Sequence, residues 1–255
     1  MLLVMDVGNT NTVLGLYQDE TLLASWRLTT NRAQTTDEYA LLVAGLFSLR
    51  GVDQRQVTDA IVSSVVPPMD STIRETFQHH YGIDPLFVGP GLKTGMPIQY
   101  DSPADVGADR IVNAVAGYAR YGGPLIIVDF GTATTFDVVS VRGEYAGGII
   151  CPGLGIAAEA LFSRTAKLPR VDIRRPARLI ATNTVGSIQS GLYYGYLGLV
   201  DGLIERLLQE LGSDTRVIAT GGLAELIGRD SRYISECDPM LTLEGLRLIW
   251  QKNRG

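Results

Sequence analysis

The sequence predicts an α/β protein made of two related halves, and two observations support this prediction. An apolar strand, a hairpin and a third strand open the chain over residues 2–28, and the same pattern restarts at residue 124. In both copies the first strand ends in an aspartate that a glycine follows two positions later. A repeat of this long period indicates two duplicated domains facing each other and is too long for a solenoid.

The first half alternates strands and helices after its opening meander. Strands are expected at residues 2–8, 12–17, 21–28, 60–66 and 85–88, and helices at 37–49, 71–81 and 111–119. The helix at 37–49 follows an Asp-Glu start signal. The dipeptide Pro67-Pro68 is expected to end the strand at residues 60–66.

The second half repeats this order. Strands are expected at residues 125–128, 134–141, 145–151 and 216–219, and helices at 155–161, 187–211, 223–227 and 241–251. The long helix carries four glycines, which predict close helix packing: Gly191, Gly195, Gly198 and Gly202. We place the domain boundary near residue 118, with a first domain at 1–118 and a second at 119–255.

Composition and charge exclude several classes of protein. The 255 residues are 45% hydrophobic and 19% charged, a composition that suffices for packed cores. The net charge is -5 and the sequence contains no polybasic block, so nucleic-acid binding is not expected. Two distant cysteines and the adjacent His79 and His80 lack the spacing of a zinc site. No apolar run reaches the ~18 residues that span a bilayer, and Met1–Met5 reads as a buried strand. We therefore expect a cytoplasmic protein.

The glycine-bearing strand ends are suited to phosphate. In the run Asp6-Val7-Gly8-Asn9-Thr10-Asn11-Thr12, glycine lets the backbone approach an oxyanion, and turn amides and polar side chains donate hydrogen bonds. A single copy would be an ordinary Asn/Gly hairpin turn. The second copy, Asp129-Phe130-Gly131-Thr132, makes phosphate binding the better hypothesis.

A third motif, Gly107-Ala108-Asp109-Arg110, precedes the helix expected at 111–119. The helix dipole favours a carboxylate there, and free amides can meet an anionic ligand. From these residues alone, a helix cap is the favoured explanation of Asp105 or Asp109, because an acidic residue at a helix start is most often a cap.

Together these motifs resemble those of a known superfamily. The two Asp-x-Gly loops and Thr220-Gly221-Gly222 are similar to the phosphate and adenosine motifs of acetate and sugar kinases, heat-shock chaperone ATPases and actin. Within it, Gly107-Ala108-Asp109-Arg110 and Asp129-Phe130-Gly131-Thr132-Ala133-Thr134-Thr135 resemble the type III pantothenate kinase family. The resemblance covers essentially the whole chain and implies two duplicated ribonuclease-H-like domains with mixed sheets and an ATP cleft between them.

The resemblance also implies a reaction and its residues. The γ-phosphate of ATP would pass to pantothenate, giving 4'-phosphopantothenate, the first step of coenzyme A biosynthesis, with Asp109 as general base. ATP contacts are expected from Asp6, Val7, Gly8, Asn9, Thr10, Asn11, Thr12, Val13, Thr132, Gly221 and Gly222. Pantothenate contacts are expected from Tyr100, Gly107, Ala108, Asp109, Arg110 and Thr184. For Tyr100 and Thr184, a loop aromatic and a helix N-cap are the ordinary alternatives.

The resemblance also implies bound cations and a partner subunit. Asp129 would coordinate K⁺ or NH₄⁺, and Asp6 would organise Mg²⁺ through water, because magnesium keeps much of its hydration shell. Arg110 suits either the pantothenate carboxylate or a transferring oxygen. A homodimer is expected, with the glycine-rich helix in the contact. The rivals are a kinase of the same fold for another small alcohol, a non-catalytic regulatory protein, and a nucleotide-binding ATPase with chaperone-like partners.

Overall fold

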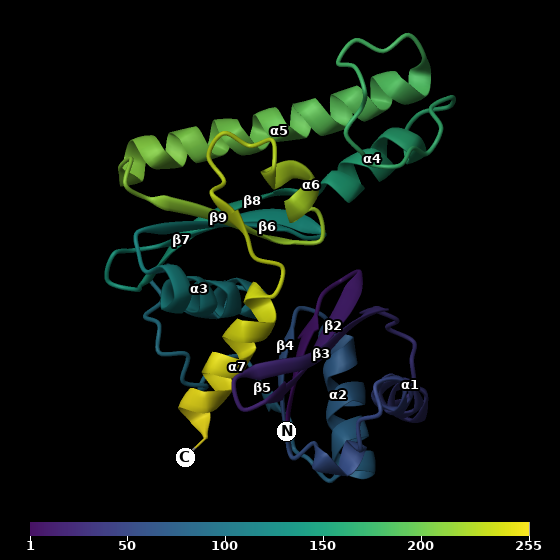
Figure 1. The fold of residues 1–255 in the computed structure, drawn as a ribbon, viewed down its shortest axis with the longest axis vertical. Coiled ribbons are helices and arrows are strands. Elements are labelled where there is room, and N and C mark those ends of the chain that lie inside the picture. The colour runs from purple at the N-terminus through teal and green to yellow at the C-terminus, as the bar shows by residue number, and fades with distance from the viewer. Residues whose placement is uncertain (255) are drawn as a thin grey trace. The chain divides into compact units, whose positions relative to one another are not determined.

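The computed structural model describes residues 1–254 and divides into two compact units. The first comprises Met1–Met96, Asp101–Ala116 and Leu241–Gly255, and the second comprises Pro97–Tyr100 and Gly117–Met240. Each unit holds one five-stranded mixed sheet with helices (Figure 1). The α/β class with two mixed sheets is therefore confirmed.

The first sheet has the strand order β3-β2-β1-β4-β5. Its strands are β1 (Leu2–Val7), β2 (Asn11–Gln18), β3 (Thr21–Thr29), β4 (Asp59–Ser64) and β5 (Leu86–Phe87). β1 is antiparallel to β2 and parallel to β4. Because a parallel neighbour requires a crossover, β4 follows helix α1 (Thr36–Leu49) and the short helix η1 (Gln54–Gln56).

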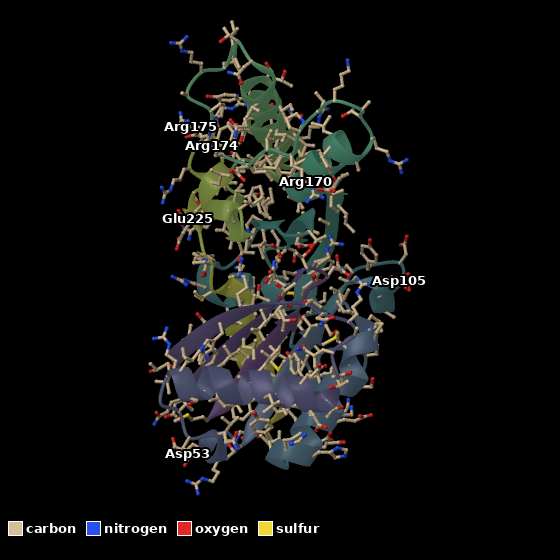
Figure 2. The ribbon with its side chains drawn as sticks, turned by 90° about the vertical axis from the view of Figure 1, so that its right-hand side faces the viewer. Asp53, Asp105, Arg170, Arg174, Arg175 and Glu225 are labelled. Carbon is tan, nitrogen blue, oxygen red and sulfur yellow. The ribbon has the colours of Figure 1, made fainter. Side chains whose placement is uncertain are left out.

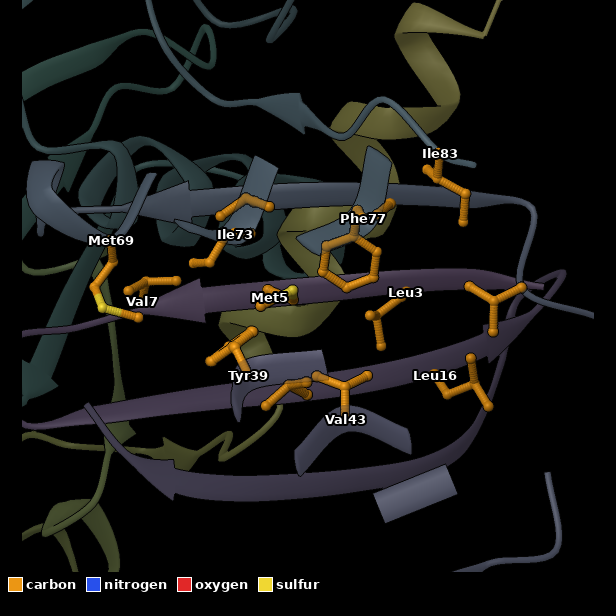
Figure 3. Packing of buried hydrophobic residues seen from close by; sticks show 14 of the residues in the cluster. Leu3, Met5, Val7, Leu16, Tyr39, Val43, Met69, Ile73, Phe77 and Ile83 are labelled. Atoms are coloured by element: carbon orange, nitrogen blue, oxygen red, sulfur yellow. The ribbon is translucent and has the colours of Figure 1, made fainter. Parts of the chain in front are cut away.

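One face of this sheet carries a hydrophobic core of the unit. Leu3, Met5 and Val7 of β1 point into it and meet side chains of α1 and of α2 (Pro67–Thr76), as Figure 3 shows for Tyr39, Val43 and Ile73. Successive side chains of a strand alternate between faces, so Leu2, Val4 and Asp6 lie on the opposite face. The position of Asp6 is thus set by the alternation of β1.

Helix α2 begins earlier than the sequence indicated. It starts at Pro67, where we had expected only the end of a strand, because proline is tolerated in the first turn of a helix, whose amides have no intrahelical acceptor. Its last turn widens into the π-helical turn η2 (Phe77–Tyr81), which ends at Gly82 with φ of 66°. His79 and His80 lie exposed in this turn, as expected for a solvated helix end.

The C-terminal helix belongs to the first unit, whereas the expected second domain ran to residue 255. Helix α7 (Leu241–Asn253) packs on the face of β1 that carries Asp6. A Cβ built on Gly15 of β2 would lie 2.9 Å from Cδ1 of Leu243, so the glycine lets this side chain of the helix pack directly on the strand. Helix α3 (Ala108–Tyr121) joins α7 through a hydrogen bond of 2.7 Å from Thr242 Oγ1 to Asn113 Oδ1.

The second sheet repeats the first. Its order is β10-β9-β6-β7-β8, with strands β6 (Leu125–Phe130), β7 (Ala133–Val139), β8 (Tyr145–Pro152), β9 (Arg216–Gly221) and β10 (Glu236–Cys237). Again the first strand is antiparallel to the next strand and parallel to the strand that follows the helices. The duplication expected from the sequence is therefore present in the strand order, although the two-residue β10 was not foreseen.

Three helices accompany this sheet: α4 (Leu154–Ser163), α5 (Thr184–Leu211) and α6 (Ala224–Gly228). α5 lies along the sheet and buries Tyr193, Tyr196 and Val200 against it (Figure 1). The prediction that its glycines pack closely is wrong within this chain. A Cβ built on any of the four would meet nothing within 4 Å apart from the helix's own backbone. No helix within residues 1–254 has both the length and the hydropathy needed to cross a membrane.

Candidate active site

The first phosphate-loop candidate is the turn that joins β1 to β2. The Gly8 amide donates to the Asn11 carbonyl over 3.0 Å, which closes the turn, and a Cβ on Gly8 would stand 3.0 Å from the same oxygen. Asn9 and Thr10 are exposed at its tip, whereas Val7 is fully buried. The predicted ATP residues Asp6 to Val13 therefore span the end of β1, the turn and the start of β2, and the tip of the turn is exposed.

Thr30, which sequence analysis did not identify, braces this turn from the end of β3. Its hydroxyl donates to the Gly8 carbonyl over 2.7 Å and shares a hydrogen bond of 2.9 Å with the Thr12 hydroxyl, and its amide donates to the Thr10 carbonyl over 2.9 Å. Thr12 is 1% exposed and its hydroxyl already has this bond, so we expect its contribution to be structural. Only the β2–β3 register brings Thr30 here, and no local sequence signal marks it.

Asp109 lies in the first turn of α3, because this helix begins at Ala108, three residues before the start expected at residue 111. Its Oδ1 accepts a hydrogen bond of 2.8 Å from the amide of Arg110, which also donates to the Gly107 carbonyl over 3.1 Å. A Cβ built on Gly107 would lie 2.6 Å from the same Oδ1. The carboxylate is thus folded back over Gly107 and has a defined position.

Burial raises the pKa of the Asp109 carboxyl, against the opposing effect of the Arg110 amide and guanidinium. Arg110 is itself 7% exposed. Asp105 is exposed on the short helix η3 (Pro103–Asp105) and makes no cap of α3 (Figure 2). The helix-cap alternative therefore fails for Asp105. For Asp109 it holds in part, because the carboxylate does accept from one first-turn amide.

The second phosphate-loop candidate joins β6 to β7 and contains Gly131 and Thr132. The Gly153 amide donates to the Thr132 carbonyl over 3.1 Å. A Cβ on Gly153 would collide with that carbonyl and lie 2.8 Å from the Gly131 oxygen, so only glycine permits this contact. The Tyr196 hydroxyl on α5 reaches both Thr134 of β7 and, over 3.2 Å, the Pro152 carbonyl.

Asp129 occupies in the second sheet the position that Asp6 occupies in the first. Its register partners are Thr135 on β7 and Thr220 on β9. Gly221 has φ of 93°, and a Cβ there would collide with the Asp129 carboxylate. The carboxylate therefore lies beside the two threonines of these register pairs and the backbone of Gly221, residues that could hold a cation. Gly222 follows as an exposed residue of the turn before α6.

Tyr100 lies beside a buried polar network of the second unit. Its ring centroid is 6.4 Å from that of Tyr145, whose hydroxyl donates to Asp137 Oδ1 over 2.8 Å. Thr135 Oγ1 donates to the other oxygen of Asp137 over 3.0 Å. Tyr100 is 40% exposed and faces Gly147, whose φ is 108°. The exposed ring of Tyr100 thus packs on the buried ring of Tyr145, which fixes its position for contact with a ligand.

Thr184 is the first residue of α5 and not its cap. The N-cap is Asn183, whose side chain accepts from the Gly186 amide over 2.8 Å, so the helix-cap alternative for Thr184 is wrong. Thr184 lines an open cavity of about 700 Å³ together with residues of α4, α5 and the segment that joins them: Ala157, Leu161, Leu168, Ser187, Ile188, Gly191 and Leu192.

The segment that joins α4 to α5 carries Arg170, Arg174 and Arg175 at its surface (Figure 2). Arg170 donates to Glu159 over 2.7 Å and Arg175 to Asp230 over 3.1 Å. Both pairs are well exposed on the arginine side and contribute little stability each. They nevertheless restrict the path of the chain that leads to Thr184.

Within the described residues, no three His, Cys, Asp or Glu side chains come together as a metal cluster. Any cation would therefore rest on single carboxylates such as Asp6 and Asp129, with the remaining ligands from water, backbone or a bound phosphate. This donor set suits hard cations of the magnesium and potassium type.

Solved structures with the same two-unit fold define the class. The chain aligns with a candidate 2-dehydro-3-deoxygalactonokinase from Sinorhizobium meliloti at a TM-score of 0.63 and 13% identity, covering 99% of this chain and 96% of that one. It aligns with the activator of the 2-hydroxyisocaproyl-CoA dehydratase from Clostridium difficile at a TM-score of 0.57 and 11% identity, covering 99% and 97%. The fold is that of the sugar kinases and related nucleotide-binding proteins.

Sequence comparison gives the particular family. The family model for type III pantothenate kinase matches residues 2–206. Type III pantothenate kinases from Koribacter versatilis and Geobacter sulfurreducens are each 58% identical to the chain and cover all of it, with 96% and 100% of the relatives' own lengths aligned. The chain belongs to the type III pantothenate kinase family, as the motifs had implied.

Proposed function

We propose that this protein transfers the γ-phosphate of ATP to the primary hydroxyl of pantothenate, giving 4'-phosphopantothenate and ADP. Family membership supports the reaction. The single structural observation that carries it is the Asp109 carboxylate, held over Gly107 at the first turn of α3 with its pKa raised by burial. A carboxylate whose pKa moves toward neutrality is a better proton acceptor than an ordinary surface aspartate.

Asp109 acts as general base. It accepts the proton of the pantothenate hydroxyl as the oxygen attacks the γ-phosphorus, and ADP leaves with the electron pair of the broken bond. Little covalent chemistry is required of the protein, so placing the acceptor and neutralising charge account for most of the rate. The hydrogen bond from the Arg110 amide keeps one carboxylate oxygen fixed and leaves the other for the acceptor.

The two loops hold the phosphates of ATP. In the first, Asp6 to Val13 offer turn amides and the exposed side chains of Asn9 and Thr10. In the second, the Gly153 amide holds the Thr132 carbonyl. Gly221 and Gly222, at the end of β9 and in the turn after it, contact the adenosine. When bound, Mg²⁺ at Asp6 and K⁺ or NH₄⁺ at Asp129 neutralise phosphate charge that would otherwise oppose the transfer.

Pantothenate is held by Tyr100, Gly107, Ala108, Arg110 and Thr184. The guanidinium of Arg110 suits either the pantothenate carboxylate or a transferring phosphoryl oxygen, since its fork binds such oxygens in pairs. The supported ring of Tyr100 provides apolar contact area, with Gly147 leaving room beside it.

We also propose a cytoplasmic homodimer. The open glycine face of α5 and the cavity beside Thr184 are surfaces that a second copy can cover. Light scattering coupled to size exclusion should give twice the 27.6 kDa chain mass. Gly195→Trp on that face should shift the protein toward monomer, and a dimer that withstands this change would exclude the face.

The reaction is tested directly with purified protein, ATP, Mg²⁺, a potassium or ammonium salt, and pantothenate. We expect 4'-phosphopantothenate and ADP in equal amounts. Asp109→Asn should reduce kcat by about 10²–10⁴-fold with folding intact. An unchanged rate in this variant would remove Asp109 from the role of base.

The competing function is phosphorylation of another small alcohol. A panel of sugars, acetate and pantothenate analogues in a coupled ADP assay separates the two. We expect pantothenate to give the highest kcat/KM, and a better sugar or acetate substrate would replace the proposal.

A further inference from the structure

Ser63 lies beside Asp6 in the first sheet. The parallel register of β1 and β4 pairs Asp6 with Ser63, so their side chains share one face. This is the face opposite the hydrophobic core, because Met5 and Val62, their neighbours along the strands, both point into that core. The same face is covered by α7, which contacts both β1 and β4.

The Ser63 hydroxyl is fully buried and lacks a hydrogen-bond partner among residues 1–254. Native proteins rarely leave a buried hydroxyl unsatisfied, because it loses its bonds to water without replacement. Next to a half-buried carboxylate, an unsatisfied hydroxyl indicates a ligand that both groups contact.

The second sheet places a hydroxyl in the same position. Thr220 of β9 is the parallel register partner of Asp129, as Ser63 of β4 is of Asp6. Thr220 is 2% exposed. Each half of the duplicated fold therefore has a buried hydroxyl beside the aspartate that ends its first strand.

We propose that the Ser63 hydroxyl hydrogen-bonds to a water in the shell of the divalent cation that accompanies the nucleotide at Asp6. This inference rests on the function proposed above, and it adds a binding residue outside every motif that the sequence shows. A hydrated cation fits better than a phosphate oxygen, because the neighbouring carboxylate repels an anion and attracts a cation. Magnesium retains several waters, which need small, fixed acceptors and donors such as this hydroxyl.

The test variant is Ser63→Ala, and its matched control is Thr215→Val. Thr215 Oγ1 is also buried without a partner among the described residues, but it lies before β9, at the opposite end of that strand from Gly221. Neither substitution removes an internal hydrogen bond, so both proteins should melt at or above the wild-type temperature. Thr215→Val therefore shows the effect of losing a buried hydroxyl that lies away from Asp6.

Binding of ADP is then measured by titration calorimetry and by thermal shift, with Mg²⁺ and with EDTA. We expect Ser63→Ala to weaken Mg²⁺-dependent ADP binding about tenfold, which equals about 1.4 kcal/mol, and to leave ADP binding in EDTA unchanged. Thr215→Val should match wild type in both. In Asp6→Asn, the further loss from Ser63→Ala should be smaller than in wild type, because both residues act on one ion.

Equal Mg²⁺–ADP affinity in Ser63→Ala and wild type would overturn the inference. An equal loss with Mg²⁺ and with EDTA would also overturn it, because the hydroxyl would then contact the nucleotide itself. The binding readout does not depend on pantothenate. A protein that shows the predicted Mg²⁺ effect but phosphorylates no pantothenate would refute the proposed function and leave the assignment of Ser63 standing.

Discussion

The substitution Gly107→Ala tests whether the position of the Asp109 carboxylate controls catalysis. A Cβ on Gly107 would lie 2.6 Å from Asp109 Oδ1, whereas real Cβ atoms essentially never come within 3.0 Å of a heavy atom that is distant along the covalent chain. The oxygen must therefore retreat by about 0.4 Å or more, the difference of those two distances. The contact is with the end of a side chain, so the backbone can stay in place.

This displacement of the Asp109 oxygen should change the free energy of unfolding little and kcat strongly. Misplacement of a reacting group by about 1 Å can cost about 10²-fold in rate, so we expect kcat to fall by about 10–100-fold. KM for ATP should change little, since the phosphate loops are untouched. A coupled ADP assay at saturating pantothenate measures kcat, and thermal melting reports stability.

The control is Gly45→Ala in α1, where a new Cβ meets nothing within 4 Å. Alanine is the better helix former, so this variant should gain about 0.5–1 kcal/mol of stability and keep wild-type kcat. The reasoning is refuted if Gly107→Ala folds normally and retains full kcat, because the carboxylate would then not depend on its place over Gly107.

Three further predictions concern pH, the second loop and the acceptor surface. Because burial raises the Asp109 pKa, the acid limb of kcat/KM should lie above the ordinary value of about 3.9. The folded state then holds a proton that the unfolded state has lost, so Asp109 reduces stability as pH rises through that window, and Asp109→Asn should melt at or above wild type at pH 7; a lower melting temperature would contradict this sign. Gly221→Ala should lose about 1–3 kcal/mol in denaturant titrations and bind ADP more weakly, because φ is 93° and the new Cβ collides with Asp129; wild-type stability would refute the steric argument. Tyr100→Ala should raise KM for pantothenate about tenfold while Tyr100→Phe stays near wild type, and equal KM values in steady-state kinetics would exclude the ring as a contact.

Much of the fold was predictable from local patterns. Apolar runs closed by turn residues located β1, β2 and β6 to within two or three residues. The repeated meander predicted two duplicated domains, and the structure gives their two sheets the same strand order. The periodicity predicts the helices, except that α2 begins at Pro67, where the sequence pattern predicts the end of a strand.

The candidate site was predictable only in part. Asp6, Asp109 and Asp129 stand in motifs that can be recognised in order along the chain. Their roles, however, came from the resemblance to a family, since an acidic residue at a helix start is also an ordinary cap. Thr30 and Tyr196, which brace the two loops, have no motif of their own and were missed.

By itself the sequence determined which strands and helices form, that they form twice, and which short runs can bind phosphate, because alternation, helical spacing and turn residues act over a few positions. Only the tertiary structure decided that the last helix packs on the first sheet against Gly15, that Asp109 folds over Gly107, and that Ser63 is buried beside Asp6. Those contacts depend on strand register and on segments far apart in the chain. A register is set by packing over the whole sheet, and no local pattern carries it.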